Sequence, residues 1–255
     1  MNAILDTWYL FVRNLRNSVR VPIIWVMSLV QPIIWLLLFS QLFKIIVDVP
    51  GFPYESYLSY LAPGIIIMTA LFGANFSGMG TIVDIDLGYV DKMLVTPVNR
   101  NAIILGRMGG DVIRVVAQTI IIVLLALAMG AGFATGFAGF VTAMAIVVLM
   151  VIGFAGLSNI LALRIREHQG FMMVINFLTL PLVFLSSAMM PMEMLPSWLQ
   201  TVAKYNPVTY AADGIRTLMT TGFDGVVLAK SFLILGGLAL VMMGIATILF
   251  RRRLV

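Results

Sequence analysis

Long stretches without any charged residue constrain this chain most. Five stretches contain no Asp, Glu, Lys or Arg, and they are residues 21–43, 56–83, 115–163, 169–192 and 231–250. A helix that crosses the hydrocarbon core of a bilayer needs about 20 apolar residues. Four of the stretches fit one crossing each, whereas the 49 residues of 115–163 fit two. Gly130, Gly132 and Gly136 supply the turn between those two. We therefore expect an all-α membrane protein with six transmembrane helices.

The expected spans lie within a single transmembrane domain, residues 1–255. They cover residues 21–43, 58–83, 112–131, 138–163, 171–190 and 227–250. Composition agrees, because 61% of the residues are hydrophobic and only 11% are charged, whereas a soluble domain carries roughly 25% charged residues. A soluble enzyme and a disordered chain are both excluded on this ground. A closed β-barrel would need alternating segments of about ten residues, and the sequence has none.

Lys and Arg positions predict the orientation. With six spans, both termini lie on one side, and that side collects 12 of the 16 basic residues. Basic residues favour the cytoplasmic side of a membrane. We therefore expect both termini in the cytoplasm and the protein in the cell (inner or plasma) membrane. This bias also accounts for the net charge of +5 without a nucleic acid partner.

Residues 1–20 predict an amphipathic helix in the membrane interface. Its apolar face would hold Ile4, Leu5, Trp8, Val12, Leu15 and Val19. The opposite face would hold Asp6, Arg13, Arg16 and Arg20. Helices of this kind lie with their apolar face in the acyl chains and their basic side chains among the headgroups. The alternative is a plain cytoplasmic extension of the first span.

Motifs of several enzyme classes are absent from the sequence. There is no phosphate-binding loop and no nucleophile elbow. No cysteine occurs, and the one histidine, His168, falls in a short cytoplasmic loop as a solvated residue. We therefore expect no catalytic residues, no metal site and no cofactor in this chain. Ion-coupled carriers usually bury charged groups within their spans, so the charge-free spans also argue against a secondary transporter or channel.

The loop between the second and third spans contains a short predicted helix, residues 86–96. Leu87, Val90, Met93 and Leu94 would share one face, and Pro97 ends the helix. This apolar face needs cover, either from the protein's own helices or from a groove on a partner. Farther along, Arg107, Asp111 and Arg114 predict an ion-pair ladder at the cytoplasmic end of span three.

The outer segment before the last span is unusually apolar for a solvated loop. Pro196 can begin one short helix, and Asn206 with Pro207 provides a cap and first residue for a second. Two short apolar helices suit a re-entrant pair over residues 195–222. Asp213 and Arg216 lie three residues apart, a spacing that favours a local ion pair over a substrate site.

Two motifs resemble those of permease subunits from type-2 ATP-binding-cassette exporters, in the daunorubicin-resistance and nodulation-export branch. The first covers residues 88–100 and continues to Arg107. The second covers residues 190–199 and 206–216. The six-span layout extends the resemblance over essentially the whole chain.

The resemblance implies partners and roles that composition does not. Two copies of the chain would pair as a homodimer, and two separate ATP-binding subunits would bind on the cytoplasmic side and hold ATP and Mg²⁺. The residues expected to couple to the ATPase are Leu87, Gly88, Val90, Asp91, Lys92, Met93, Leu94, Pro97 and Arg100. Those expected along the translocation path, in spans two and five, are Asn75, Ser77, Asn176, Thr179 and Ser186. Those expected in the outer hairpin are Pro196, Trp198, Asn206, Pro207, Tyr210, Asp213 and Arg216.

The expected function is the permease of an ATP-driven exporter. Its substrate would be an amphipathic drug-like or lipid-linked molecule that leaves from the cytoplasm or inner leaflet. A polysaccharide or lipid-linked glycan exporter is the alternative within the family. The polar residues of spans two and five could instead pack only against helices of the same chain, and the sequence leaves that choice open.

Overall fold

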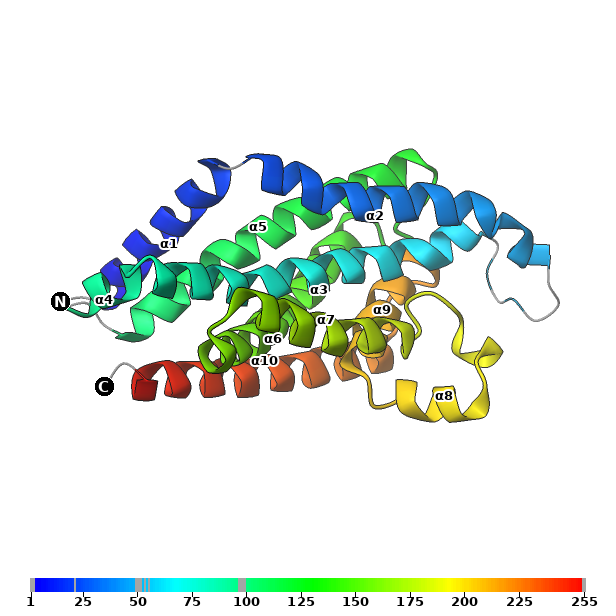
Figure 1. Ribbon diagram of the computed structural model, residues 1–255. Helices are drawn as coiled ribbons and strands as arrows, with labels where there is room; N and C mark the ends of the chain where they lie inside the picture. Colours follow the sequence, from blue (N-terminus) through cyan, green and yellow to red (C-terminus); the bar gives the residue numbers. More distant parts are fainter. Residues whose placement is uncertain are drawn as a thin grey trace.

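The computed structural model describes residues 3–20, 22–48, 52, 54, 56–95 and 100–253. These residues form helices joined by turns and loops, with no strand among them. Five long helices dominate (Figure 1): α2 (Pro22–Leu42), α3 (Tyr57–Asp86), α5 (Arg100–Ala128), α6 (Gly136–Ile165) and α10 (Gly225–Arg253). The shorter elements are α1 (Ala3–Arg20), η1 (Lys44–Asp48), α4 (Tyr89–Leu94), α7 (His168–Phe184), η2 (Met192–Met194), α8 (Ser197–Ala203) and α9 (Pro207–Thr220). The prediction of an all-α protein is confirmed.

Five helices of the described residues are long and apolar enough to cross a bilayer, namely α2, α3, α5, α6 and α10. The protein is therefore a multi-pass membrane protein. The sixth expected span corresponds to α7, an apolar helix of 17 residues. Its crossing of the bilayer stays a prediction.

Helix α3 forms the centre of the bundle, because 83% of its apolar window is buried, compared with 17% in the apolar windows of α2 and α10. It packs on α5, α6, α9, α2 and α7, and α10 covers α6 on the other side (Figure 1). Small residues permit this close packing. A Cβ atom at Gly156 would lie 2.9 Å from the backbone of Met242, so α6 and α10 are in backbone contact there.

Several helix ends differ from the expected span limits. Helix α5 begins at Arg100 instead of residue 112, since its first turns pack on α1 outside the apolar stretch. Helix α7 ends at Phe184 instead of residue 190. There the Ser186 hydroxyl donates to the Val183 carbonyl and accepts from the Ala188 amide, 2.6 and 3.2 Å away. Such local bonds replace those that a continuing helix would make.

The outer segment contains the two expected short helices, α8 and α9. Asn206 caps α9, because its side chain accepts a hydrogen bond from the Val208 amide at 2.9 Å, and Pro207 is the first residue of that helix. The predicted cap is confirmed. However, α9 packs against α3, α6 and α10 and is largely buried, so it belongs to the bundle core more than to a peripheral hairpin.

Candidate functional site

Helix α1, helix α4 and the C-terminal end of α10 lie at the same end of the bundle (Figure 1). Helix α1 lies in a glycine groove on α5. A Cβ atom at Gly106 would lie 2.7 Å from the Leu10 Cβ, and one at Gly110 would lie 2.7 Å from the Asn14 Nδ2. The Asn14 amide also donates to the Arg107 carbonyl at 2.7 Å. Helix α1 is thereby held directly against α5.

The outward side of α1 matches an interfacial helix. Leu5 and Trp8, from the expected apolar face, are 51% and 58% exposed. Arg16 and Arg20 are exposed as well. Val12 and Leu15 of the same face are partly buried, so the protein leaves only the part with Leu5 and Trp8 uncovered among the described side chains, as a lipid-facing helix requires.

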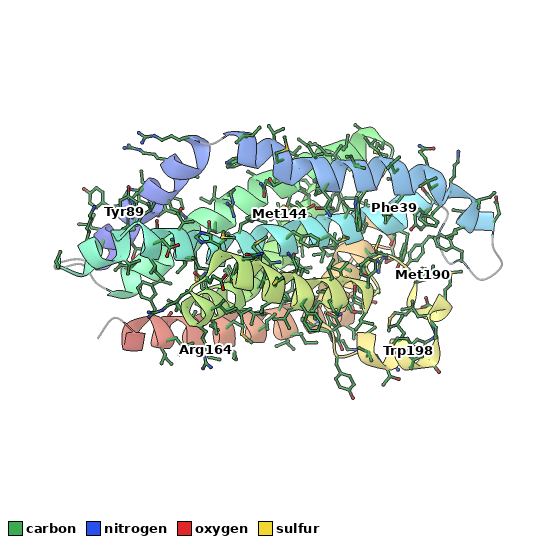
Figure 2. The ribbon with its side chains drawn as sticks, in the orientation of Figure 1. Phe39, Tyr89, Met144, Arg164, Met190 and Trp198 are labelled. Atoms are coloured by element: carbon green, nitrogen blue, oxygen red, sulfur yellow. The ribbon has the colours of Figure 1, made fainter. Side chains whose placement is uncertain are left out.

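Helix α4 divides the expected apolar face of the loop. Val90 is buried against the bundle, whereas Leu87 is 59% exposed and Val95 is 86% exposed. Tyr89 lies beside α1 (Figure 2), with the Arg13 guanidinium 4.8 Å and the Lys92 ammonium 5.5 Å from its ring centre. Val90 thus attaches α4 to its own protein, whereas Lys92 within the helix and Leu87 and Val95 on either side of it are exposed.

The remaining coupling candidates are only partly described. Gly88 has a φ of +65° directly after α3, a left-handed conformation that favours glycine. The side chains of Asp91, Met93, Leu94 and Arg100 lie outside the described residues, as does Pro97 altogether.

The expected Arg107–Asp111–Arg114 ladder is present only in part. Arg114 pairs with Asp111 at 3.8 Å. Arg107 instead forms an ion pair with Asp84 at the end of α3, and Arg13 of α1 approaches the same carboxylate at 3.9 Å. Asp84 therefore joins α1, α3 and α5. The sequence gives no signal for this arrangement, because the partners are far apart in the chain.

A buried polar network connects α3, α5 and α6. The Ser77 hydroxyl donates to Asp111 at 2.5 Å, and the Asn159 amide donates to Ser77 at 2.9 Å. Thr81 donates to Asn159 at 2.5 Å, and Ser158 donates to the Asn75 carbonyl at 2.7 Å. In a bilayer these groups need such internal partners. The network thus joins the three helices through buried hydrogen bonds.

The five expected path residues do not share one surface. Ser77 belongs to that network, and Ser186 lies buried beyond the end of α7. Asn75 donates to Thr179 at 2.9 Å, which joins α3 to α7. Only Asn176 is exposed, in a groove of about 550 Å³ between α2, α3, α5 and α7. The groove also contains Gln31 and Gln118, so it is apolar with a few amide groups.

A second polar cluster holds α9 to α3 at the opposite end. Arg216 pairs with Asp213 at 2.6 Å and donates to the Ser187 carbonyl at 2.6 Å. Its guanidinium also lies 4.0 Å from the centre of the Tyr60 ring, and the Tyr60 hydroxyl donates to the Ser187 carbonyl at 2.5 Å. The predicted Asp213–Arg216 pair is confirmed, although Arg216 is only 4% exposed and does not lie on a surface helix.

The other outer residues are near the surface. Trp198 on α8 is 63% exposed and Pro196 is exposed (Figure 2). The Tyr210 hydroxyl donates to the Lys204 carbonyl at 2.7 Å. In the loop between η1 and α3, burial raises the pKa of Tyr54 above its ordinary value, and the positive charge of nearby Arg216 opposes that shift.

Taken together, these clusters hold helices in place and present surfaces. Within the described part of the chain, no three His, Asp or Glu side chains group as metal ligands. Several charged groups pair across helices, as Asp84 of α3 does with Arg13 of α1 and Arg107 of α5.

Comparison with known proteins gives one consistent match. The sequence model of the ABC-2 type transporter family matches residues 6–220. A putative transport permease, ycf38, of Cyanophora paradoxa is 32% identical over 200 residues, which cover 78% of this chain and 69% of the relative. The daunorubicin resistance ABC transporter permease protein DrrB1 of Streptomyces coeruleorubidus is 29% identical, covering 76% and 68%. The inner membrane transport permease YadH of Escherichia coli K12 is 26% identical, covering 76% and 75%.

Proposed function

Because the chain belongs to the ABC-2 type transporter family, we propose that it is the membrane permease of an ATP-driven exporter. The substrate would be an amphipathic drug-like or lipid-linked molecule. Support for the drug-like class comes from the relative named for daunorubicin resistance. The apolar groove between α2 and α7, with its few amide groups, has the chemistry that such a ligand needs.

Helix α4 and the residues that flank it carry this proposal, because they form the expected contact with the ATPase. Leu87 and Val95 are exposed apolar side chains at the end of the bundle that holds both termini, and Lys92 beside them is exposed too. An exposed apolar patch with a charged neighbour is typical of an interaction site. Two ATP-binding subunits would dock there, one on each permease copy, and would hold ATP and Mg²⁺ themselves.

The proposed topology has six spans, with α7 as the fifth and both termini in the cytoplasm. The basic residues support this orientation, since 12 of the 16 fall on the terminal side. Two copies would pair across α2 and α7, where Asn176 and Gln31 are exposed within apolar helices. Polar groups of this kind face protein or water more readily than lipid.

In the proposed mechanism, ATP binding brings the partner subunits together and moves α4. That motion passes through Tyr89 to α1 and through α3 to the rest of the bundle. The path between the two copies then opens outward past α8 and α9. The ATPase can drive this change only because it contacts the two permease states differently.

Co-purification with the ATP-binding subunit tests the docking surface. Leu87→Asp and Val95→Asp each place a charge on an exposed residue that flanks α4, and we expect both to abolish ATPase co-purification and transport. Leu94→Asp tests the face that the residue spacing predicts for this helix, and we expect the same loss. Phe223→Asp is the matched control, because Phe223 is 59% exposed but lies in the loop before α10. Unchanged ATPase binding by Leu87→Asp and Val95→Asp would contradict the proposal.

The substrate class needs a separate measurement. Candidate substrates are added to the reconstituted permease–ATPase complex, and stimulation of ATP hydrolysis is recorded. We expect amphipathic cations and lipid-linked compounds to stimulate hydrolysis, and free polysaccharide to have no effect. Stimulation by a lipid-linked glycan alone would favour the glycan exporter instead.

A further inference from the structure

A cavity at the terminal end of the bundle has no role in the proposed transport path. It has a volume of about 430 Å³ and lies between α1, α3, α4, α5 and α10. We call it the terminal cavity and define it by Leu10, Val83, Asp84, Tyr89, Val90 and Arg107. Its walls combine apolar side chains with the guanidinium groups of Arg13 and Arg107 and the carboxylate of Asp84. This combination suits an amphiphile better than a wholly polar or wholly apolar ligand.

Arg107 contributes to the charge preference of the terminal cavity. One terminal nitrogen of Arg107 is bonded to Asp84, whereas its Nε is buried and has no hydrogen-bond partner among the described residues. A buried N–H without an acceptor is unfavourable. The guanidinium also presents its donors in a fixed fork that matches phosphate oxygens. The Nε itself is closed off from solvent, so the preference of the cavity rests on its two guanidinium groups, Arg13 and Arg107, against the one carboxylate of Asp84, which together favour an anion such as a phosphate group.

The position of the cavity indicates where that phosphate would come from. Helix α1 forms one wall through Leu10 and turns Trp8 outward, with 58% of its surface exposed. Tryptophan at this exposure is typical of the headgroup level of a bilayer. A phospholipid beside α1 would have its headgroup at the height of the cavity and its acyl chains along the apolar surface.

We propose that the terminal cavity binds the headgroup phosphate of an anionic phospholipid. Tyr89 and Val90 of α4 line the same cavity, so a bound headgroup would contact the helix that is expected to dock on the ATPase. A ligand that binds one position of α4 more tightly shifts α4 toward that position. The lipid would thus act as a regulator of coupling, at a site separate from the transported substrate.

Binding is measured on the purified full-length chain alone, so its outcome does not depend on the proposed transport function. Short-chain phosphatidylglycerol or phosphatidylcholine is titrated into delipidated protein in a neutral detergent, and retained lipid is counted by native mass spectrometry. Both lipids carry the phosphate diester, but phosphatidylcholine adds a cationic choline group that the guanidinium groups of Arg13 and Arg107 would repel. We therefore expect a Kd for phosphatidylglycerol about tenfold lower. Millimolar inorganic phosphate should not displace the lipid, because it lacks the apolar contacts.

Three variants locate the site. Arg107→Gln removes the guanidinium and should raise the Kd about tenfold. Val83→Phe keeps every charge but fills the cavity, and should weaken binding to a similar degree. Arg16→Gln is the control, since it removes the same charge from the exposed surface of α1 outside the cavity, and should change the Kd less than about twofold. If Arg107→Gln is not monodisperse, Val83→Phe decides alone.

Four results would overturn the proposal. They are equal affinity for the two lipids, an Arg16→Gln effect as large as that of Arg107→Gln, no effect of Val83→Phe, and displacement of the lipid by inorganic phosphate. The last result would identify a site for free phosphate instead of a lipid headgroup.

Discussion

Arg216 is buried within apolar helices and depends on a small set of partners. Its guanidinium contacts Asp213, the Ser187 carbonyl and the Tyr60 ring. Arg216→Ala would leave Asp213 without its cation and the Ser187 carbonyl with one donor fewer. We expect a loss of about 3 kcal/mol, the lower end for a broken buried pair because Asp213 is 37% exposed. The loss is measured by thermal unfolding of the purified protein.

Arg216→Lys refines this test, because lysine keeps the charge but lacks the planar fork. We expect it to recover less than half of the loss. Lys230→Ala is the control, since Lys230 is exposed on α10, and it should leave the unfolding temperature unchanged. An Arg216→Ala protein as stable as the parent would show that the cluster contributes nothing to stability.

Single residues were predictable where a local rule applies. The Asn206 cap and the Asp213–Arg216 pair each depend on spacings of two or three residues, and both are present. The contact of Tyr60 with Arg216 spans 156 residues. No local pattern encodes it, so the burial of Arg216 could not be predicted from the sequence.

At the scale of elements, the packing of α1 on α5 rests on glycine. A Cβ atom at Gly106 would lie 2.7 Å from the Leu10 Cβ and 2.8 Å from the Thr7 carbonyl oxygen. Since the latter is backbone, Gly106→Ala must push α1 away from α5. We expect a destabilisation of about 1–3 kcal/mol, as for other overpacked contacts, and faster proteolysis of the N-terminal helix.

Gly236→Ala is the matched control for this change. Gly236 is also helical, but a Cβ atom there has open space around it. Alanine has a higher helix propensity than glycine, so this variant should be as stable as the parent or slightly more stable. If both alanine variants behaved alike, the glycine groove would not determine the position of α1.

Element type was easier to predict than element limits. Charge-free stretches correspond to α2, α3, α6 and α10, because lipid selects strongly against charge. The limits differ where other interactions take over. Helix α5 continues to Arg100 on contacts with α1, and α7 stops at Phe184 where Ser186 bonds to the backbone. Neither effect is visible in the hydropathy of the sequence.

For the whole molecule, the sequence correctly predicts a helical membrane protein but not which helix lies at its centre. Mean hydropathy cannot distinguish lipid-facing from protein-facing helices, because the apolar windows of α2 and α3 share a value of 1.6 although 17% of the first and 83% of the second are buried. The polar residues carry that information. Ser77, Asn159 and Asp111 bond to one another inside the bundle, whereas the exposed large apolar residues of α10 include Leu233, Leu240 and Val241. The exposed apolar face of α10 is therefore expected to contact lipid.

The face that carries the groove between α2 and α7 is where a second copy should bind. Phe177 on α7 is 76% exposed and adjoins the exposed amide of Asn176, whereas Leu240 on α10 is equally exposed among apolar neighbours. The chain contains no cysteine, so Phe177→Cys and Leu240→Cys each create a single reactive site. We expect oxidation in membranes to cross-link the Phe177→Cys protein into dimers and to leave the Leu240→Cys protein monomeric. Preferential cross-linking at position 240 would place the interface on α10, and would also remove the α2–α7 groove from the proposed translocation path.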